Sequence, residues 1–312
     1  MEKVIEVKDL TKSYGTLKAL DHLSFEVQKG EILGLLGPNG SGKSTMINCL
    51  LSLLSFEQGS IQIFGQEMRP DAYEIKARIG VVFQDVAVFD ELTVWENIQY
   101  FCGLYISDKQ KRVAYVEEAI QLVGLGEFKK FYPKQLSGGL LRRLNIACGI
   151  AHKPDLIFLD EPTVAVDPQS RNHILEGIRQ LNQRGATIIY TTHYMEEVEQ
   201  LCNRIIIIDK GTILAQGTKE QLKQLTTTKE KITVELEGLS DADFEALRKS
   251  PSIEDALYDG SVLYLTYKKG NHNLSTLVDY MKDHHIAYDR IFSELPSLND
   301  VFLELTGKEL RD

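Results

Sequence analysis

The chain carries one run of residues that fits the phosphate-binding pattern G-x-x-x-x-G-K-[ST], namely Gly37-Pro38-Asn39-Gly40-Ser41-Gly42-Lys43-Ser44-Thr45. Glycines in this pattern let consecutive backbone N–H groups converge on phosphate oxygens, and the helix that follows adds its partial positive charge. We expect Lys43 to reach the β- and γ-phosphates of ATP and Ser44 to ligate Mg²⁺. An ordinary glycine-rich turn is the alternative.

Two carboxylates, Asp160 and Glu161, follow the apolar run 156–159. The carboxyl end of a buried strand is where an open α/β sheet places its ligand. We therefore expect Asp160 to hold Mg²⁺ through its water shell, and Glu161 to polarise the attacking water as a general base. The alternative is a buried strand that ends in an acidic helix start. The phosphate-binding pattern elsewhere in the chain favours the catalytic interpretation.

A short segment upstream of the carboxylates, Leu136-Ser137-Gly138-Gly139, matches the signature motif of ABC-type ATPases. Over about residues 4–220 the chain resembles that family. In the family this serine and these glycines bind the γ-phosphate that the opposite subunit holds. The resemblance therefore implies ATP hydrolysis and a homodimer, or a close heterodimer, around two ATP·Mg²⁺.

Four further positions take their roles from this resemblance. Tyr14 is similar to the aromatic residue that stacks on adenine. Gln84 is similar to the Q-loop glutamine, which contacts the metal or the water and links the core to a helical arm. Asp167 resembles the D-loop aspartate that communicates across the dimer, and His193 resembles the switch histidine at the γ-phosphate. Without the resemblance, a structural histidine at a strand end would be the better interpretation of His193.

Two segments depart from the family pattern. Leu140-Leu141 stands where most relatives carry Gln or Met followed by a basic or polar residue. Ala165-Val166 stands where Gly-Leu is usual. Neither departure removes a predicted phosphate contact, but the first could alter dimer packing or the rate of hydrolysis.

The hydrophobic pattern predicts the elements that position these residues. Nearly continuous apolar runs indicate buried parallel strands, alternation indicates an antiparallel edge, and helical spacing indicates a helical insertion at about 88–152. The expected strands are 4–7, 23–27, 31–36, 156–159, 187–191 and 205–208, and the expected helices are 46–54, 94–104, 110–123, 140–151 and 171–182. Together with the resemblance, they predict an α/β P-loop NTPase core of the ABC ATPase type, a mixed sheet with a helical subdomain, over residues 1–220.

A smaller domain is predicted after this core. Polar residues at 221–228 indicate a linker, and residues 229–312 read β-α-β-β-α-β, the ferredoxin-like α+β pattern. We expect strands at 231–236, 253–258, 261–267 and 288–293, and helices at 241–249, 273–284 and 297–305.

The C-terminal segment 295–307 resembles the tail of the daunorubicin-resistance type of ABC ATPase. That resemblance implies a separate membrane permease and export of a drug, antibiotic, peptide or cell-surface polymer. Candidate apolar contacts to the permease are Phe89, Leu92, Val94 and Trp95, for which a plain core role is at least as good an interpretation. The alternatives are an importer ATPase with a C-terminal regulatory domain, a non-transport ABC ATPase, and a module that senses ATP without turnover.

Composition narrows the class of protein. The 312 residues carry a formal net charge of −10 with no Lys/Arg-rich run, so we expect no binding to nucleic acid or to an anionic membrane surface. No apolar run approaches the roughly 20 residues that span a bilayer, so we expect a peripheral position on the cytoplasmic face of the membrane, through the permease. The four cysteines lie far apart, which predicts reduced thiols and no metal site made by protein ligands alone.

Overall fold

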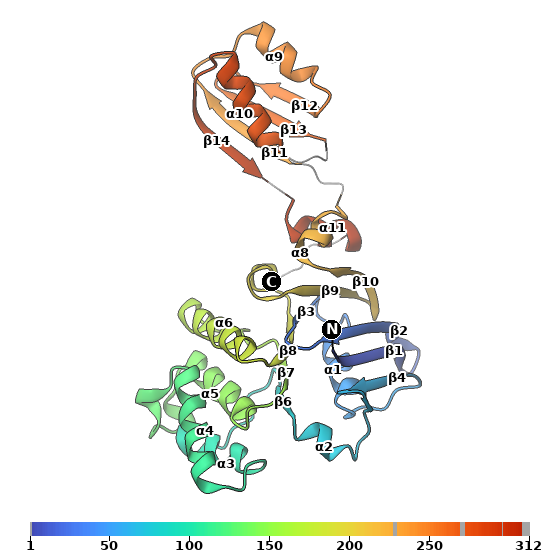
Figure 1. The fold of residues 1–312 in the computed structure, drawn as a ribbon, viewed down its shortest axis with the longest axis vertical. Helices are drawn as coiled ribbons and strands as arrows, with labels where there is room; N and C mark the ends of the chain where they lie inside the picture. Colours follow the sequence, from blue (N-terminus) through green and yellow to red (C-terminus); the bar gives the residue numbers. More distant parts are fainter. Residues whose placement is uncertain (1, 227–229, 269–271, 295, 308–312) are drawn as a thin grey trace. The chain divides into compact units, whose positions relative to one another are not determined.

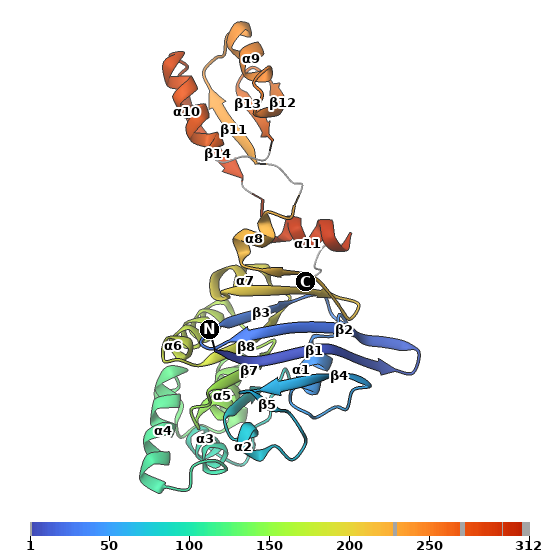
Figure 2. The same cartoon turned by 45° about the vertical axis from the view of Figure 1, so that its right-hand side comes forward.

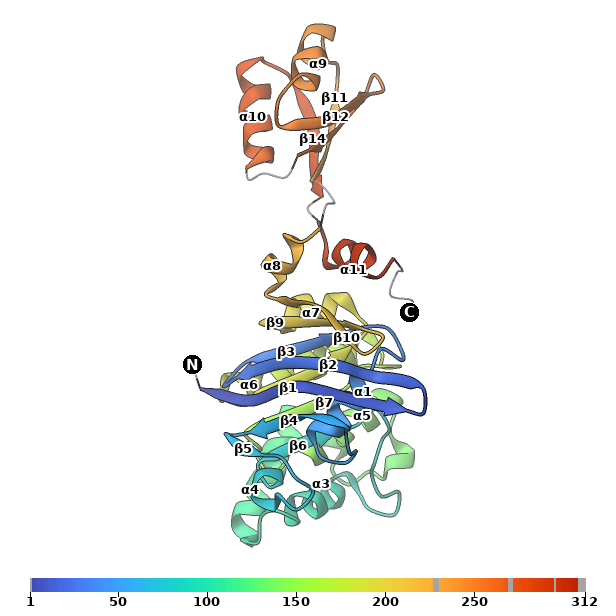
Figure 3. The same cartoon turned by 90° about the vertical axis from the view of Figure 1, so that its right-hand side faces the viewer.

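The computed structural model describes residues 2–226, 230–268, 272–294 and 296–307. They fall into two compact units, one within Met1–Lys219 and the other within Glu220–Glu309. Figures 1 to 3 show each unit from three sides. Residues 227 and 228 of the predicted linker, the first and last residues of the predicted accessory domain, and Leu295 of the tail segment lie outside the described residues.

The first unit is built on a six-stranded sheet with the order β10-β9-β3-β8-β7-β6. Neighbouring strands from β9 to β6 pair in parallel, and β10 pairs antiparallel with β9. Every residue of β3, β7 and β8 is buried, as expected for parallel strands covered on both faces. The bounds are β3 Ile32–Leu36, β6 Ile79–Val82, β7 Leu156–Asp160, β8 Thr187–Thr192, β9 Arg204–Asp209 and β10 Thr212–Gly217. The predicted parallel strands are thus confirmed, whereas β6 and β10 were not predicted.

A separate antiparallel sheet has the order β2-β1-β4-β5 (Figure 2). Its strands are β1 Lys3–Tyr14, β2 Leu17–Gln28, β4 Gln58–Ile63 and β5 Gln66–Glu67. We expected the first two strands at the antiparallel edge of the main sheet, and this placement was wrong, because β10 is the antiparallel edge strand. The strands β1 and β2 are buried on one face only. Their inward side chains share a core with Met46 and Ile47 of α1 (Lys43–Leu50), and the strands therefore pack beside the parallel sheet instead of extending it.

The helical arm holds α3 (Val94–Gly103), α4 (Lys109–Leu122) and α5 (Gly138–Ile150), with 3-10 turns at Gly126–Phe128 and Pro133–Gln135. A capping box between Thr93 and Glu96 fixes the start of α3. The remaining helices of the first 226 residues are α2 (Tyr73–Lys76), α6 (Pro168–Gln183), α7 (Met195–Leu201) and α8 (Lys219–Lys223). The helices predicted in the arm and at α6 are confirmed. The predicted helix at 46–54 begins earlier, at Lys43, and ends at Leu50.

The second unit has the predicted ferredoxin-like order. Its elements are β11 Lys231–Leu236, α9 Asp241–Arg248, β12 Ile253–Tyr258, β13 Val262–Tyr267, α10 Asn273–Asp283, β14 Tyr288–Glu294 and α11 Leu298–Thr306. The strands form one antiparallel sheet in the order β12-β13-β11-β14. Leu247 of α9 and Leu277 and Met281 of α10 pack on one face of this sheet, and Figure 3 shows α10 on that side.

Candidate active site

A cleft of about 520 Å³ lies where the phosphate-binding pattern predicts it, at the turn from β3 into α1. The predicted residues among its lining come from four separate parts of the sequence. The lining residues are Tyr14, Leu17, Lys18, Ala19, Asn39, Gly40, Gly42, Lys43, Ser44, Thr45, Gln84, Glu161 and Lys210. Tertiary packing thus brings the adenine, phosphate, Q-loop and general-base candidates together.

Close backbone packing explains two glycines of the loop. A Cβ on Gly37 would lie 2.2 Å from the carbonyl oxygen of Ile208, so no larger residue fits. Gly42 caps the start of α1 with a φ of +109°, and a Cβ there would lie 2.6 Å from the carbonyl oxygen of Ala19. The loop is therefore held close to β9 and β2, and its conformation depends on glycine.

Lys43 is buried at the first turn of α1. Its Nζ donates hydrogen bonds to the carbonyl oxygens of Gly37 at 2.7 Å and Pro38 at 3.1 Å, and lies 3.6 Å from Oε1 of Glu161. Burial lowers the pKa of Lys43, and the charges of Glu161 and Asp160 oppose that shift. The ammonium group thus lies between the loop and the carboxylates and lines the cleft, where it can bind an anionic ligand.

The carboxylates follow β7 as predicted. Thr191 on the neighbouring β8 donates from Oγ1 to Oδ1 of Asp160 at 2.5 Å, and the same Oγ1 accepts from the N–H of Glu161 at 2.9 Å. Glu161 has a φ of +47°, a conformation that L-residues rarely adopt. Nδ1 of His193 lies 3.5 Å from Oε2 of Glu161. The general-base candidate therefore lies between the Lys43 ammonium and the imidazole.

The signature and D-loop residues lie elsewhere. Ser137 caps α5 by accepting from the N–H of Leu140 at 3.3 Å, and Asp167 caps α6 by accepting from Ser170 at 2.9 Å. A Cβ on Gly139 would lie 2.6 Å from Oδ2 of Asp167, so the two loops pack directly on each other. The hydrogen bonds from Ser170 lower the pKa of Asp167. Among the described residues, neither Asp167 nor any of Ser137, Gly138 and Gly139 lines the cleft.

The two departures from the family pattern have distinct surroundings. Leu140 and Leu141 are half-buried and pack against the core of the helical arm. Ala165 is exposed and has a φ of +57°, a conformation that favours glycine. None of these three residues lines the cleft.

Arg142 was not predicted, although it connects the parts of the site. It is 4% exposed, and its guanidinium donates to the carbonyl oxygens of Phe83, Gln84, Asp160, Glu161 and Pro162. One side chain of α5 thus joins the main chain of the Q-loop to the main chain of the two candidate carboxylate residues. A signal was present in the sequence: Arg142 stands beside Arg143 in a largely apolar helix, where a buried charge requires partners.

Glu197 on α7 was also missed. It is 2% exposed, and its Oε2 accepts hydrogen bonds from the hydroxyls of Tyr190 at 2.7 Å and of Thr163 and Thr192 at 2.9 Å. Thr163 follows the general-base candidate and Thr192 precedes His193. The glutamate therefore joins the segments that carry the candidate catalytic residues Glu161 and His193. Lys18, Thr191 and Lys210 were missed as well, since only tertiary packing places them at the site.

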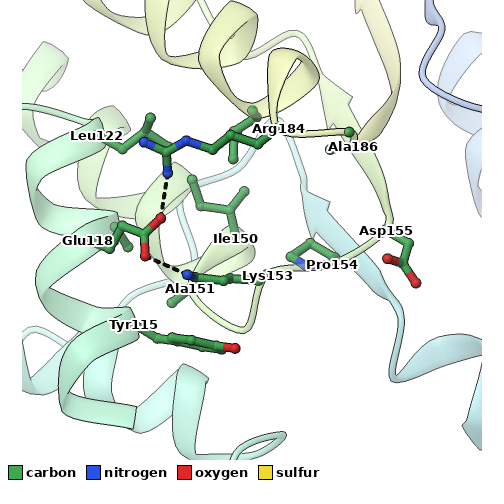
Figure 4. Close-up of a pocket in the computed structure, with 13 residues that line it drawn as sticks. Tyr115, Glu118, Leu122, Ile150, Ala151, Lys153, Pro154, Asp155, Arg184 and Ala186 are labelled. Carbon is green, nitrogen blue, oxygen red and sulfur yellow. Dashed lines mark hydrogen bonds and ion pairs between the residues drawn. The ribbon is translucent and has the colours of Figure 1, made fainter. Parts of the chain in front are cut away.

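A second pocket, of about 320 Å³, lies between α4 and the turns after α5 and α6 (Figure 4). Glu118 in its wall accepts from Arg184 and Lys153, each at 2.5 Å. Glu118 is thus paired with two cations of the pocket wall, and Asp155, which also lines the pocket, pairs with Arg78. None of the predicted site residues lines it.

Comparison with known proteins identifies the family. The family described as "ABC transporter" matches residues 20–164. The linearmycin resistance ATP-binding protein LnrL of Bacillus subtilis is 38% identical over 99% of this chain and 100% of its own length. The chain belongs to the ATP-binding proteins of ABC transporters. It is therefore an ATP-binding ATPase subunit of a transporter, as the signature motif predicted.

Other relatives agree with this assignment. The daunorubicin resistance ATP-binding protein DrrA3 of Streptomyces coeruleorubidus is 33% identical over 99% of this chain and 98% of its own length. The Nod factor export ATP-binding protein I of Ralstonia nicotianae is 36% identical over 99% of this chain and 95% of its own length. Among solved structures, the dimeric post-hydrolysis cassette MJ0796 bound to ADP and Pi covers 69% of this chain and 98% of its own, with 28% identity and a TM-score of 0.63. The predicted ABC ATPase fold and the daunorubicin-resistance resemblance are thus confirmed.

Proposed function

We propose that two copies of this chain close around two ATP·Mg²⁺ and that hydrolysis drives a separate membrane permease. The observation that carries the proposal is that the cleft holds only part of the predicted set of ATP-binding residues. It contains the phosphate loop, Lys43 and Glu161, whereas Ser137 and its glycines lie outside it. A second copy would supply the missing signature loop to the γ-phosphate, giving two complete sites for each dimer.

In the proposed mechanism, Lys43 neutralises the β- and γ-phosphates and the loop N–H groups bind their oxygens. Glu161 takes a proton from the attacking water, and His193 orients the γ-phosphate beside it. The cleft offers few metal ligands of its own, which suits Mg²⁺, an ion usually bound through one or two protein groups plus substrate phosphates. Ser44, Gln84 and Asp160 would hold it, and it would neutralise charge on the phosphates.

The contacts of Arg142 would transmit closure of the dimer to the helical arm. Because its guanidinium binds the carbonyls of Gln84 and Glu161 together, a shift of the Q-loop and a shift of α5 are mechanically linked. In this scheme, ATP-driven engagement of Ser137 at the start of α5 moves the arm relative to the core. Hydrolysis and phosphate release reverse the movement.

The permease would dock on the arm. A groove of about 490 Å³ is lined by Leu92, Glu96, Gln99, Tyr100, Gly103, Leu104 and Arg112. Among the four candidate contacts, Val94 is fully buried and Trp95 packs on the arm core, so these two have the plain core role. Phe89 is 41% exposed, stacks on Phe101 and meets Tyr100 edge to face, and Leu92 lines the groove. In this part of the chain the apolar surface thus suits a helix from a membrane protein.

Export is the favoured direction. The relatives that align over nearly the whole chain are named for drug resistance and for Nod factor export. The cargo would then be a drug, antibiotic, peptide or cell-surface polymer, and the ATPase would lie on the cytoplasmic face of the membrane, held by the permease. No helix in the described ranges is both long and apolar enough to cross a bilayer. An importer with a C-terminal regulatory domain is the second candidate, and the ferredoxin-like unit is the feature that favours it.

The deciding experiment measures the mass of Glu161→Gln in solution with saturating ATP and Mg²⁺. We expect a stable dimer with bound ATP, because the amide cannot accept the proton from water while the phosphate contacts remain. Lys43→Ala, which loses the phosphate contact, is the matched control and should stay monomeric. A Glu161→Gln chain that is saturated with ATP and still monomeric at every concentration would overturn the sandwich.

A further inference from the structure

In the described part of the ferredoxin-like unit, no helix covers one face of the sheet. Side chains at alternate positions of β11, β13, β12 and β14 point away from α9 and α10, which cover the opposite face. The central row across this open face is Leu257, Tyr264, Thr233 and Phe292, joined by strand register. Leu257 is 62% exposed, Tyr264 43% and Phe292 49%. Three of the four side chains of this apolar row are large hydrophobic groups, and exposed groups of this kind mark an interaction surface.

Charged side chains flank the apolar row in a definite order. On one side, Lys231 of β11 is in register with Glu294 of β14. On the other side, Glu235 is in register with Arg290, and the two form a loose pair at 3.9 Å. On β11 a positive charge thus precedes the apolar row and a negative charge follows it. On β14 the residue beside that positive charge is negative, and the residue beside that negative charge is positive.

We propose that this open face binds the same face of a second copy of the chain, about a twofold axis that runs along the apolar row. That axis sets each residue of the central row against its own copy. It also exchanges the flanks, so Lys231 faces Glu235 of the second copy and Glu294 faces Arg290 of the second copy. On β11 and β14 both flanks become complementary, whereas on β12 the axis sets Asp255 against Asp259 of the second copy.

A twofold axis parallel to the strands is the alternative, and it is disfavoured because it brings like charges together. It would exchange β12 with β14 and set Asp255, which shares the row of Lys231, against Glu294 of the second copy. Like charges placed opposite each other destabilise a contact. Single-stranded RNA, which stacks on exposed aromatic residues of such sheets, is disfavoured by Glu235, Glu294 and Asp255, because they repel phosphates. The charges therefore favour a second copy and specify its orientation.

The test is a thiol cross-linking experiment on the full chain without nucleotide. It is repeated after the charges at residues 231 and 235 of β11 have been exchanged. Thr233→Cys places a thiol on the proposed axis, and face-packed sheets lie about 10 Å apart, so a bismaleimide of that reach should join two copies. The four native cysteines are buried or half-buried, and the unsubstituted chain measures their background. Lys249→Cys at the C-cap of α9, where the native side chain is 77% exposed, controls for random collision.

Within the Thr233→Cys chain, Lys231→Glu alone and Glu235→Lys alone should each lower the cross-linked yield several-fold, since each sets two like charges face to face. The double change should raise the yield above that of either single variant, because the exchanged charges meet again across the axis, although within each chain it places like charges beside Glu294 and Arg290. Residues 231 and 235 are too far apart along one strand to pair within a chain. Restoration therefore reports contact between copies.

Three results would overturn the proposal. One is a Thr233→Cys yield no higher than that of Lys249→Cys. Another is a double variant that stays as low as the single ones. The third is cross-linking of position 233 to the first unit of its own chain or to a co-expressed membrane protein. The contact needs no nucleotide, so its failure leaves the ATP-dependent dimer of Glu161→Gln untouched, and failure of that dimer leaves the cross-link untouched.

Discussion

Nη2 of Arg142 donates a hydrogen bond of 2.8 Å to the main-chain carbonyl oxygen of Glu161. The donor lies on α5, the helix that begins at the signature serine, and the acceptor belongs to the candidate general base. The bond therefore joins the loop that would reach a partner's nucleotide to the residue that would activate water in its own cleft. Since the guanidinium also binds the Q-loop, its loss should affect both the fold and turnover.

Arg142→Met should lower the free energy of unfolding by roughly 3 kcal/mol, because it leaves several buried carbonyl oxygens without donors. Urea denaturation measures this change. Arg143→Met is the control, since the neighbouring side chain donates hydrogen bonds to the carbonyl oxygens of Val123 and Gly124 and to none at the Q-loop or the carboxylates among the described residues. Equal losses from the two variants would contradict the role assigned to Arg142. Arg142→Lys should keep most of the stability and still lose turnover, since one ammonium cannot bind both loops.

Glu161→Gln should reduce the rate of ATP hydrolysis roughly 10²–10⁴-fold, the usual contribution of a positioned general base. ATP affinity should change little, because the lysine and loop contacts to phosphate remain. Phosphate release and equilibrium nucleotide binding, measured on the same sample, separate the two quantities. A variant that loses affinity in proportion to turnover would show that Glu161 serves binding instead of water activation.

Gly37→Ala should destabilise the chain by about 2 kcal/mol and abolish ATP binding. The new methyl group would lie 2.2 Å from the carbonyl oxygen of Ile208, so the loop or β9 must move. Thermal unfolding with and without ATP reports both effects. Gly238→Ala is the matched control, because no atom lies within 4 Å of the added Cβ. ATP-dependent stabilisation that survives in Gly37→Ala would refute the tight-loop explanation.

Glu197→Ala should lower the free energy of unfolding by about 3 kcal/mol, since three buried hydroxyls lose their acceptor. Turnover should fall further than ATP affinity, because Thr163 and Thr192 lead to the two catalytic loops. Chemical denaturation and kcat against KM measure these effects. Glu196→Ala, at the exposed neighbouring position, should be close to neutral. A kcat unchanged in Glu197→Ala would mean that the carboxylate supports the fold alone.

His193→Ala should reduce kcat while leaving the free energy of unfolding within about 0.5 kcal/mol of the native value. The imidazole is close to Glu161 at 3.5 Å, but its Nδ1 has no hydrogen-bond partner in the described part of the chain. Little native structure therefore depends on it. Steady-state kinetics beside urea denaturation gives both values, and a large loss of stability would indicate the structural histidine considered first.

The sequence by itself determined the chemistry and most of the elements. Phosphate binding, the acidic strand end and the signature loop are local patterns, and local patterns depend on residue type and spacing alone. The same holds for the second unit, where alternation places Ile232 and Val234 on one face and Thr233 on the other.

Only the tertiary structure decided which of these parts meet. The position of the β1–β2 hairpin in its own sheet follows from the core it shares with α1, and the partners of Arg142 and Glu197 come from loops far away in the chain. The same is true of the charge order around Tyr264 and Phe292, which requires the strand register. Such contacts depend on how elements pack, and no periodicity along one segment specifies the side chains of another.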